Sequence, residues 1–451
     1  MKELWQLPSN WEWQEMREFV KWTSGGTPKA TEKAFYENGT ISWLITADLN
    51  DNWVYSSQKA ITDLAFKSSS TKMVEIGSVL VAMYGSIGKL GIAGIKCCTN
   101  QAIAFSKELN GVDNKYLFYY FKAIKSYLIS LGKGGTQANI SLTVLNSLTI
   151  PLPPTIDEQC HIVARLEDLL LGLNSARDRL EKIPAILRRF RQSVLSAACS
   201  GRLTAEWREG NECEKSYKII AESLTVRNKQ NKSEPIALIE IGLDFTKYAQ
   251  IELPATWIWT AIANYATCSR GRFSIRPRND PRCYDGQYPF IQIGDLPKDG
   301  GFINQHKQTL NDFGLKTSKI FPKGTVCIAI VGATIANTGI LSYDMCFPDS
   351  LVGIETGTET GNRFIEYYLR YVKEDIRRVS YAGGGQPNIK LETLNPFPMP
   401  LPPLPEQEEI VRRVDQLFAL ADSIEQRYNT AKATLAKAEK ALYKKAFSGE
   451  L

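Results

Sequence analysis

Two glycine-containing turns are the first places where the residue types suggest phosphate chemistry. One reads Gly85-Ser86-Ile87-Gly88-Lys89-Leu90. A nucleotide-binding P-loop needs four residues between its glycines, and a Ser or Thr after the lysine to hold magnesium. Here two residues intervene and Leu90 follows the lysine, and the second turn, Gly332-Ala333-Thr334-Ile335, has no lysine. The sequence therefore predicts turns between strands and argues against nucleotide hydrolysis.

Three other glycine-rich segments combine open backbone with polar side chains. Lys133-Gly134-Gly135-Thr136-Gln137 and Gly383-Gly384-Gly385-Gln386 each follow a predicted helix, and Ser24-Gly25-Gly26-Thr27-Pro28-Lys29 lies near the start of the chain. Accessible N–H groups beside Gln and Asn suit phosphate and base-edge contacts. Helix C-caps and tight turns explain such clusters equally well, so both interpretations stay open.

A basic segment occupies the place in the second half of the chain where the first has Ser24-Gly25-Gly26. It reads Ser269-Arg270-Gly271-Arg272 and is followed by Arg276 and Arg278. Arginines in a loop suit an anion such as nucleic acid, and a solvated loop is the alternative. The formal net charge of the chain, +6, permits a polyanionic partner without requiring one.

Signatures of catalysis are missing from the sequence. The 9 cysteines are scattered without a Cys-x-x-Cys pair, and His161 and His306 are the 2 histidines, so a zinc or nucleophilic site is poorly supplied. No Asn/Asp-Pro-Pro-aromatic tetrapeptide and no dinucleotide-type glycine spacing occurs. We expect a chain that is not an enzyme and holds no cofactor or metal. Without an apolar signal-peptide core or a transmembrane-length run, it is expected in the cytoplasm, away from membranes.

The chain contains one unit twice. Leu7-Pro8-Ser9-Asn10-Trp11-Glu12-Trp13 returns as Leu253-Pro254-Ala255-Thr256-Trp257-Ile258-Trp259, and Pro151-Leu152-Pro153-Pro154 returns as Pro400-Leu401-Pro402-Pro403. Matching residues between these blocks keep their order. In each copy a glycine precedes a buried strand, at 77–83 and 324–330, and an amphipathic helix precedes the glycine cluster, at 114–131 and 362–378. Each globule is therefore predicted to be α+β.

A long amphipathic helix follows each globule. The apolar positions are spaced alternately by four and three residues over several heptads, which is the pattern of a coiled coil. Pro184 interrupts the first helix and should kink it, whereas Lys432 stands at the equivalent place in the second. Each helix of about 45 residues would extend roughly 65 Å. The first copy of the pattern and then its second copy read as follows: Ile162, Leu166, Leu169, Leu173, Ala176, Leu180, Ile183, Leu187, Phe190, Val194; Ile410, Val414, Leu417, Ala421, Ile424, Tyr428, Ala431, Leu435, Ala438, Leu442.

Equivalent helices of one chain are expected to pair antiparallel, with pseudo-two-fold symmetry relating the two globules. The predicted parts are a first globule (1–152), its helix (153–203), a polar linker (204–250), a second globule (251–402) and its helix (403–451). Apolar residues also lie beside the seam, where either the globules or a partner protein would cover them. These residues are Val163, Leu170, Leu195, Val411, Phe418 and Tyr443.

The doubled pattern resembles a known family. Each globule opens with Leu-Pro-x-x-Trp-x-Trp and closes with Gly-Gly-x-Gln-x-Asn-Ile and Pro-Leu-Pro-Pro, and each long helix ends in Ser-Gly-x-Leu. This combination resembles the specificity subunit of a type I restriction–modification enzyme. The Ser-Gly-Gly-Thr-Pro loop common in that family is present at 24–28 and absent from the second globule, which indicates a different recognition subclass.

The resemblance implies a function. The globules would be target-recognition domains that each read one half of a split sequence in double-stranded DNA, and the helices would set the unread spacer. Two modification subunits, which bind S-adenosylmethionine, would dock on the helices, and restriction subunits would supply ATP- and magnesium-dependent cleavage. The apolar residues beside the seam would bind the modification subunits. The candidate DNA contacts are Thr27, Lys29, Ser86, Lys89, Lys133, Thr136, Gln137, Arg270, Arg272, Thr334, Gln386 and Asn388.

A second hypothesis comes from another functional class. In it the chain is a structural protein whose coiled coil holds two protein-binding globules apart. Steep salt dependence of binding would favour DNA, because phosphate contacts release counterions.

Overall fold

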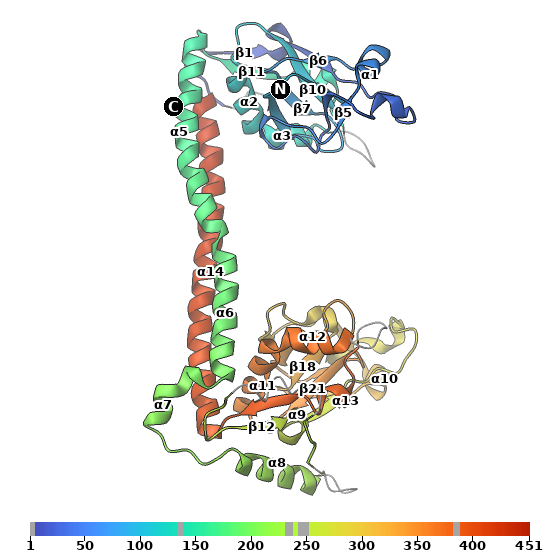
Figure 1. Ribbon diagram of the computed structural model, residues 1–451, viewed down its shortest axis with the longest axis vertical. Coiled ribbons are helices and arrows are strands. Elements are labelled where there is room, and N and C mark those ends of the chain that lie inside the picture. The colour runs from blue at the N-terminus through green and yellow to red at the C-terminus, as the bar shows by residue number, and fades with distance from the viewer. Residues whose placement is uncertain (1–4, 133–138, 231–237, 242–251, 382–387) are drawn as a thin grey trace. The chain divides into compact units, whose positions relative to one another are not determined.

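The chain forms two compact units. The computed structural model describes residues 5–132, 139–230, 238–241, 252–381 and 388–451. One unit comprises Met1–Lys182 with Arg427–Leu451, and the other comprises Ile183–Gln426. Each unit therefore combines one globule with part of the long helices (Figure 1).

The first globule is built from short strands and four helices. Its strands are β1 (Glu12–Glu15), β2 (Val20–Ser24), β3 (Ile41–Leu44), β4 (Asn52–Val54), β5 (Ala60–Ile61), β6 (Met73–Val74), β7 (Val79–Ala82), β8 (Leu90–Ala93), β9 (Cys97–Thr99), β10 (Ile103–Leu109) and β11 (Thr149–Leu152). Its helices are α1 (Asp63–Ser68), α2 (Asn114–Ala123), α3 (Lys125–Ser130) and α4 (Leu142–Asn146).

The second globule repeats this composition. Its strands are β12 (Ile258–Ala261), β13 (Thr267–Arg270), β14 (Tyr284–Phe290), β15 (Phe302–Ile303), β16 (Gln308–Leu310), β17 (Ile320–Phe321), β18 (Val326–Ala329), β19 (Thr338–Leu341), β20 (Met345–Cys346), β21 (Leu351–Glu355) and β22 (Pro398–Leu401). Its helices are α9 (Ile262–Tyr265), α10 (Asp312–Lys316), α11 (Glu359–Tyr371), α12 (Lys373–Tyr381) and α13 (Leu391–Leu394).

The sheets of the two globules have the same strand order. In the first the orders are β2-β10-β7-β8-β4, β5-β3-β9-β6 and β1-β11; in the second they are β13-β21-β18-β19-β15, β16-β14-β20-β17 and β12-β22. Every strand thus has one counterpart. The predicted buried strands after Gly77 and Gly324 are β7 and β18, and all residues of both are buried. The α+β prediction and the internal repeat are confirmed.

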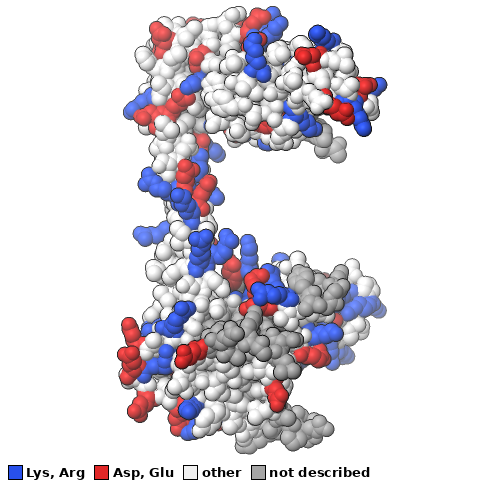
Figure 2. Space-filling model, in the orientation of Figure 1, with Lys and Arg blue, Asp and Glu red and all other residues white. Residues whose placement is uncertain are grey.

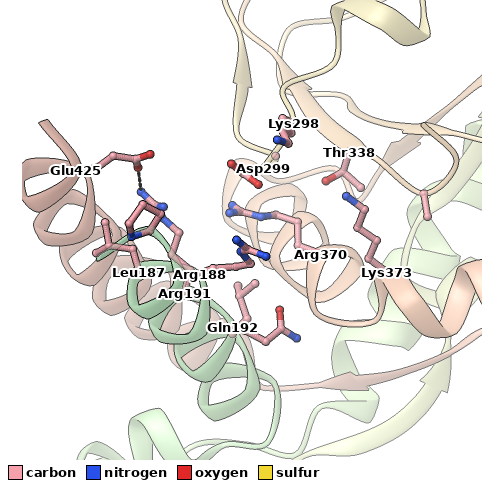
Figure 3. A pocket seen from close by; sticks show the side chains of 14 residues that line it. Leu187, Arg188, Arg191, Gln192, Lys298, Asp299, Thr338, Arg370, Lys373 and Glu425 are labelled. Atoms are coloured by element: carbon pink, nitrogen blue, oxygen red, sulfur yellow. Dashed lines mark hydrogen bonds and ion pairs between the residues drawn. The ribbon is translucent and has the colours of Figure 1, made fainter. Parts of the chain in front are cut away.

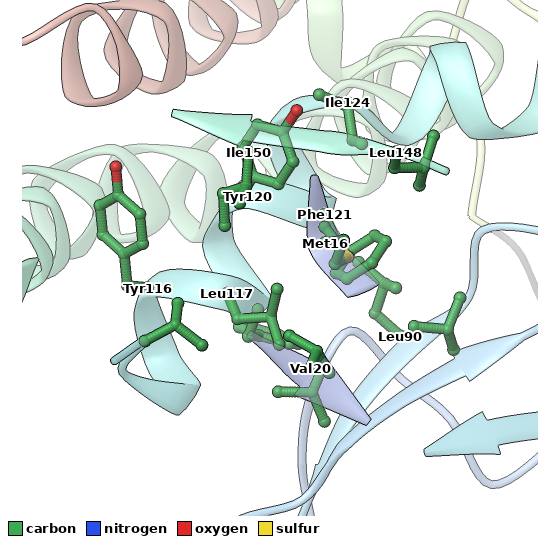
Figure 4. Packing of buried hydrophobic residues seen from close by; sticks show 14 of the residues in the cluster. Met16, Val20, Leu90, Tyr116, Leu117, Tyr120, Phe121, Ile124, Leu148 and Ile150 are labelled. Atoms are coloured by element: carbon green, nitrogen blue, oxygen red, sulfur yellow. The ribbon is translucent and has the colours of Figure 1, made fainter. Parts of the chain in front are cut away.

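A helix with many aromatic side chains covers the central sheet in each globule. Figure 4 shows α2 of the first globule, where Leu117 and Phe121 lie toward Met16 and Val20. The predicted single helices are each broken in two. Ile124 and Val372 end α2 and α11 with nearly identical backbone angles (φ −94°, ψ 11° and φ −91°, ψ 11°), after which α3 and α12 begin. In the second globule, α11 starts at Glu359, which is earlier than the predicted start at residue 362.

The long helices differ as Pro184 predicts. The first is divided into α5 (Ile156–Glu181) and α6 (Ile183–Cys199), whereas α14 runs unbroken from Leu404 to Phe447. Proline removes an N–H donor and crowds the preceding turn, so the interruption falls beside it. The linker is more ordered than its composition suggests. It contains α7 (Ala205–Glu209) and α8 (Tyr217–Gln230), and Ile220 packs into the second globule's core.

The helices pair antiparallel within each unit. In the first, Ile162 and Leu166 near the start of α5 share an apolar cluster with Phe447 at the end of α14. In the second, Val194 near the end of α6 shares a cluster with Ile410 near the start of α14.

An ion pair joins the two long helices at equivalent positions in both units, but the basic and the acidic residue change places between the units. Arg177 of α5 lies 2.6 Å from Glu439 of α14, and Glu425 of α14 lies 2.7 Å from Arg191 of α6. By the internal repeat, Glu425 is the counterpart of Arg177 and Arg191 is the counterpart of Glu439. The pairing is therefore the same in both units.

A glycine follows the end of each long helix. Gly201 (φ +76°) and Gly449 (φ +74°) are left-handed, a conformation that favours glycine. A Cβ on Gly201 would overlap Pro254, and one on Gly449 would overlap Pro8. The Ser-Gly-x-Leu end of each helix thus packs against a Leu-Pro-x-x-Trp motif, which explains why the two motifs recur together.

Candidate nucleic-acid interface

The loop Ser24–Lys29 is held by its glycines against β9 and β10. The N–H groups of Gly25 and Gly26 donate to the carbonyls of Ile103 (3.3 Å) and Thr99 (3.0 Å). A Cβ on Gly25 would overlap the Thr99 carbonyl, so this close approach requires glycine. The loop leaves Thr27, which contacts the Gln101 side chain, and Lys29 exposed. Both are placed where DNA could reach them.

The equivalent loop of the second globule keeps these backbone contacts despite its different sequence. The N–H groups of Gly271 and Arg272 donate to the carbonyls of Leu351 (2.9 Å) and Phe347 (3.1 Å), the counterparts of Ile103 and Thr99. A Cβ on Gly271 would overlap the Pro348 carbonyl. The second globule thus lacks the Ser-Gly-Gly-Thr-Pro sequence but retains its loop geometry.

The arginines of this loop are less available than the sequence suggests. Arg272 donates from Nη2 to the Ser318 carbonyl at 2.6 Å and from Nε at 3.1 Å, and Arg270 donates from Nε to the Asp349 carbonyl at 2.8 Å. Arg276 and Arg278 both pair with the Asp349 carboxylate. Arg272 therefore helps hold the loop, so substituting it would disturb structure as well as any DNA contact. Substituting Arg270 would test a DNA contact with less effect on the structure of the loop.

The turns after β7 and β18 are strand connections, as predicted. Ser86 and Lys89 are partly exposed in the first turn, and Lys89 donates from Nζ to the Thr46 carbonyl at 3.5 Å. Thr334 lies in the second turn, and its buried hydroxyl has no hydrogen-bond partner among the described residues. Because that hydroxyl is shielded from solvent, Thr334 is a weaker candidate for a DNA contact than its place in the turn suggests.

Each turn lies beside the segment that follows a glycine cluster. Asn139 forms a β-bridge with Tyr84, and Asn388 forms the equivalent bridge with Val331. Asn388 is exposed and thus lies at the same edge as Thr334. The candidates Lys133, Thr136, Gln137 and Gln386 lie outside the described residues. In the first globule, the turn that contains Ser86 therefore lies beside Asn139. In the second globule, the turn that contains Thr334 lies beside Asn388.

Of the two alternatives for the apolar residues beside the seam, the structure favours cover by the chain's own globules. Val163, Leu170 and Tyr443 are buried in the core of the first unit. Leu195 and Val411 are buried in the second, where Phe418 packs edge-on against the Tyr367 ring at 5.8 Å. An aspartate at Leu170 or Phe418 would therefore disturb the globule–helix contact itself.

Different apolar residues of the helices are exposed. Beyond the first turns of α5 and α14, where Ile156 and Leu404 are exposed, they are Leu171 on α5 (68%), Ile186 on α6 (60%), and Leu420 (55%) and Ile424 (38%) on α14. Ile424 is a seam position of the heptad pattern, so its exposure departs from the prediction. A partner could reach these four side chains without displacing the globules.

Polar contacts that join each globule to its helices are not evident from composition or motifs. Trp11 donates from Nε1 to Glu158 at 3.0 Å, and Trp257 donates to Glu406 at 2.7 Å. Lys115 pairs with Glu167, and the equivalent Arg363 pairs with Asp415. The internal repeat could have indicated these contacts, because both partners of each contact recur at matching positions in the two copies.

Comparisons with known proteins agree with the repeated architecture. The family model described as Type I restriction modification DNA specificity domain matches residues 8–185 and 274–433. The Escherichia coli type I restriction enzyme EcoDI specificity subunit is 28% identical over 448 residues, covering 99% of this chain and 90% of that protein. The Escherichia coli EcoBI specificity subunit is 31% identical over 374 residues, covering 78% and 69%.

A solved structure shares the fold. It was described as the structural basis underlying complex assembly and conformational transition of the type I R-M system. One of its chains aligns with a TM-score of 0.69 at 17% identity, covering 99% of this chain and 100% of that one. At this level of identity the likeness concerns the fold alone.

The chain belongs to the family of type I restriction–modification DNA specificity proteins. It is a specificity subunit, which recognises the DNA target through its two recognition domains and is not itself catalytic. The enzymatic activities and their cofactors belong to partner subunits. None of the helices in the described part of the chain is long and apolar enough to cross a membrane.

Proposed function

We propose that each recognition domain reads one half of a bipartite DNA target and that the paired helices set the length of the unread spacer. The domains would span 1–152 and 251–402, with helices at 153–203 and 403–451 and the linker at 204–250. The observation that carries this proposal is the repeated attachment of globule to helix, as in the pairs Lys115–Glu167 and Arg363–Asp415. A fixed attachment in both units would hold two half-site readers at one spacing.

We propose that DNA contacts come from loop residues of each globule. In the first domain these are Thr27, Lys29, Ser86, Lys89, Lys133, Thr136 and Gln137, and in the second they are Arg270, Arg272, Thr334, Gln386 and Asn388. Lysine and arginine would mainly bind phosphate, whereas Gln, Asn and a free arginine fork can read base edges. Arg270 supports this role best, since it is exposed and its hydrogen bond to the Asp349 carbonyl engages Nε rather than the ends of the guanidinium.

We propose that the partners include two modification subunits and, in the full assembly, restriction subunits acting in the cytoplasm. The docking surfaces would include Leu171 in the first unit, and Ile186, Leu420 and Ile424 in the second, which are exposed apolar residues of the long helices. Apolar side chains exposed on a helix favour association with another protein.

Aspartate at Leu171 and Leu420 is expected to abolish co-purification of the modification subunits, because it puts charge into an apolar interface. Both side chains are exposed, so the chain's own stability should change by about 0.5 kcal/mol or less. The measurement is the mass of the complex after co-expression, with thermal unfolding of the chain alone. Leu64→Asp, an equally exposed leucine (54%) on α1, is the control. Full retention of both modification subunits by the double variant would rule out this surface.

A further inference from the structure

A hollow between α6 and the second globule gathers positive charge. Within the second unit, it is bordered by α6, by the segment before β15, and by α11 and α12. Five of its lining side chains are cationic and two are anionic; the cations are Arg188, Arg191, Lys298, Arg370 and Lys373, and the anions are Asp299 and Glu425. Figure 3 shows Arg188 pointing from α6 toward the part of the hollow bordered by Asp299 and Arg370.

Two of these cations already have partners. Arg191 pairs with Asp422 (2.6 Å) and Glu425 (2.7 Å). Arg370 lies 3.6 Å from the buried Glu366 and stacks over the Phe418 ring. Within the part of the chain that the structure describes, the other three, Arg188, Lys298 and Lys373, have no carboxylate at ion-pair distance.

The first unit differs from the second at the equivalent junction. Lys125, the counterpart of Lys373, pairs with Asp51. Ala436 stands where the second unit has Arg188. The place of Asp51 is taken in the second unit by Gly300, with a similar left-handed backbone (φ +59° and +76°), and no room for a side chain remains there beside Arg370. A surplus of cations is thus shared by both junctions, whereas Arg188 and a Lys373 without an ion pair are particular to the second unit.

Lys373 is in an unfavourable position without an anion. Burial lowers its pKa, and Arg377 and Arg370 lower it further, while Glu374 and Asp299 act in the opposite direction. Desolvation and like charges both disfavour an ammonium group. A phosphate bound in the hollow would favour the charged form of Lys373.

The hollow adjoins the edge that carries the candidate DNA contacts. Ala336 and Thr338 line it, and they follow the turn that contains Thr334. Arg377 of α12 donates from Nε to the Ile335 carbonyl of that turn at 3.0 Å. Figure 2 shows Lys and Arg gathering where the long helices meet the second globule. A DNA strand held by those loops would pass close to this charge.

We propose that Arg188, Lys298 and Lys373 form a phosphate-binding site for the DNA backbone beside the second half-site. The inference rests on DNA recognition by the second globule. The site joins a helix residue to two globule residues, so a bound phosphate would bridge both parts of the unit. It adds affinity without reading bases, since phosphate contacts carry no sequence information.

The test compares DNA binding by the full chain, with its modification subunits, across a salt series. Lys298→Gln, Lys373→Gln and Arg188→Gln are each expected to weaken binding roughly fivefold at about 0.15 M salt, and each should lower the slope of log K against log salt by about 0.9, the value of one phosphate contact. The weakening should be the same on duplexes of unrelated sequence. Lys218→Gln, which removes an exposed charge from α8, is the control and should change neither quantity.

Three outcomes would overturn the inference. One is an unchanged salt slope in the three variants while the wild type binds DNA normally. Another is weaker binding confined to one sequence, which would make these residues base readers. The third is loss of stabilisation by inorganic phosphate with DNA binding intact, which would make the hollow a site for a free anion. Failure of the wild-type complex to bind duplex DNA would instead contradict the proposed function.

Discussion

Truncating Phe447 to alanine is expected to destabilise the first unit by about 3–5 kcal/mol, the usual cost of deleting a buried aromatic ring. Phe447 ends α14 and is fully buried. Its ring lies 5.1 Å from Tyr116, 5.4 Å from Tyr120 and 6.1 Å from Trp5. The end of α14 should consequently separate from the first globule. Urea unfolding would measure the free energy, and hydrogen exchange along 427–447 would locate the change.

Cys199→Ala is the matched control for this substitution. Cys199 ends α6 and is the counterpart of Phe447 in the second unit, where it is also buried. It is much smaller, so its truncation should cost about 1 kcal/mol. Equal destabilisation at the two positions would mean that the aromatic cluster does not carry the contact between helix and globule in the first unit.

Replacing Glu406 with alanine is expected to destabilise the second unit by about 3–5 kcal/mol, because it breaks a buried ion pair and leaves its donors unpaired. Glu406 is fully buried near the start of α14. Its carboxylate accepts hydrogen bonds from Trp257 Nε1 (2.7 Å) and Thr204 Oγ1 (2.6 Å), and pairs with Arg208. Thermal unfolding and exchange of the first turns of α14 would show the destabilisation.

Glu158→Ala tests whether that cost comes from the network. Glu158 holds the equivalent place in the first unit but is partly exposed, and its carboxylate accepts a hydrogen bond from Trp11. Removing it should cost about 1 kcal/mol, the value of an ordinary hydrogen bond. Destabilisation at Glu158 as large as that at Glu406 would contradict the account. The two units would thus be joined to their helices by different means, an aromatic cluster in the first and a carboxylate network in the second.

Much of the architecture was predictable because its determinants are local or repeated. The alternation of four and three residues predicted the long helices, and Pro184 predicted the break before α6. The Ser-Gly-x-Leu motif places Gly201 and Gly449 just after the helix ends, where a left-handed residue favours glycine. The repeat itself predicted that both globules share one fold, and the strand orders agree element by element.

The sequence did not reveal which distant segments meet. Val163 and Phe418 resembled an exposed stripe on a two-helix rod, yet the globules cover them. Arg272 resembled a free DNA contact, yet its guanidinium donates to the Ser318 carbonyl. Both differences between sequence and structure have one cause. The environment of a side chain depends on contacts between segments that are distant in the sequence, and periodicity and composition do not encode those contacts. Site residues are therefore less predictable than helices and strands.

The most direct test of the central claim is genome-wide mapping of methylated adenine in cells with and without this gene, the modification subunit being present in both. We expect a motif of two specific parts separated by an unread spacer of constant length, present with the gene and absent without it. Arg270→Ala should change or weaken one part and leave the other intact. An identical methylation pattern in both strains, or loss of a single continuous motif, would contradict the account.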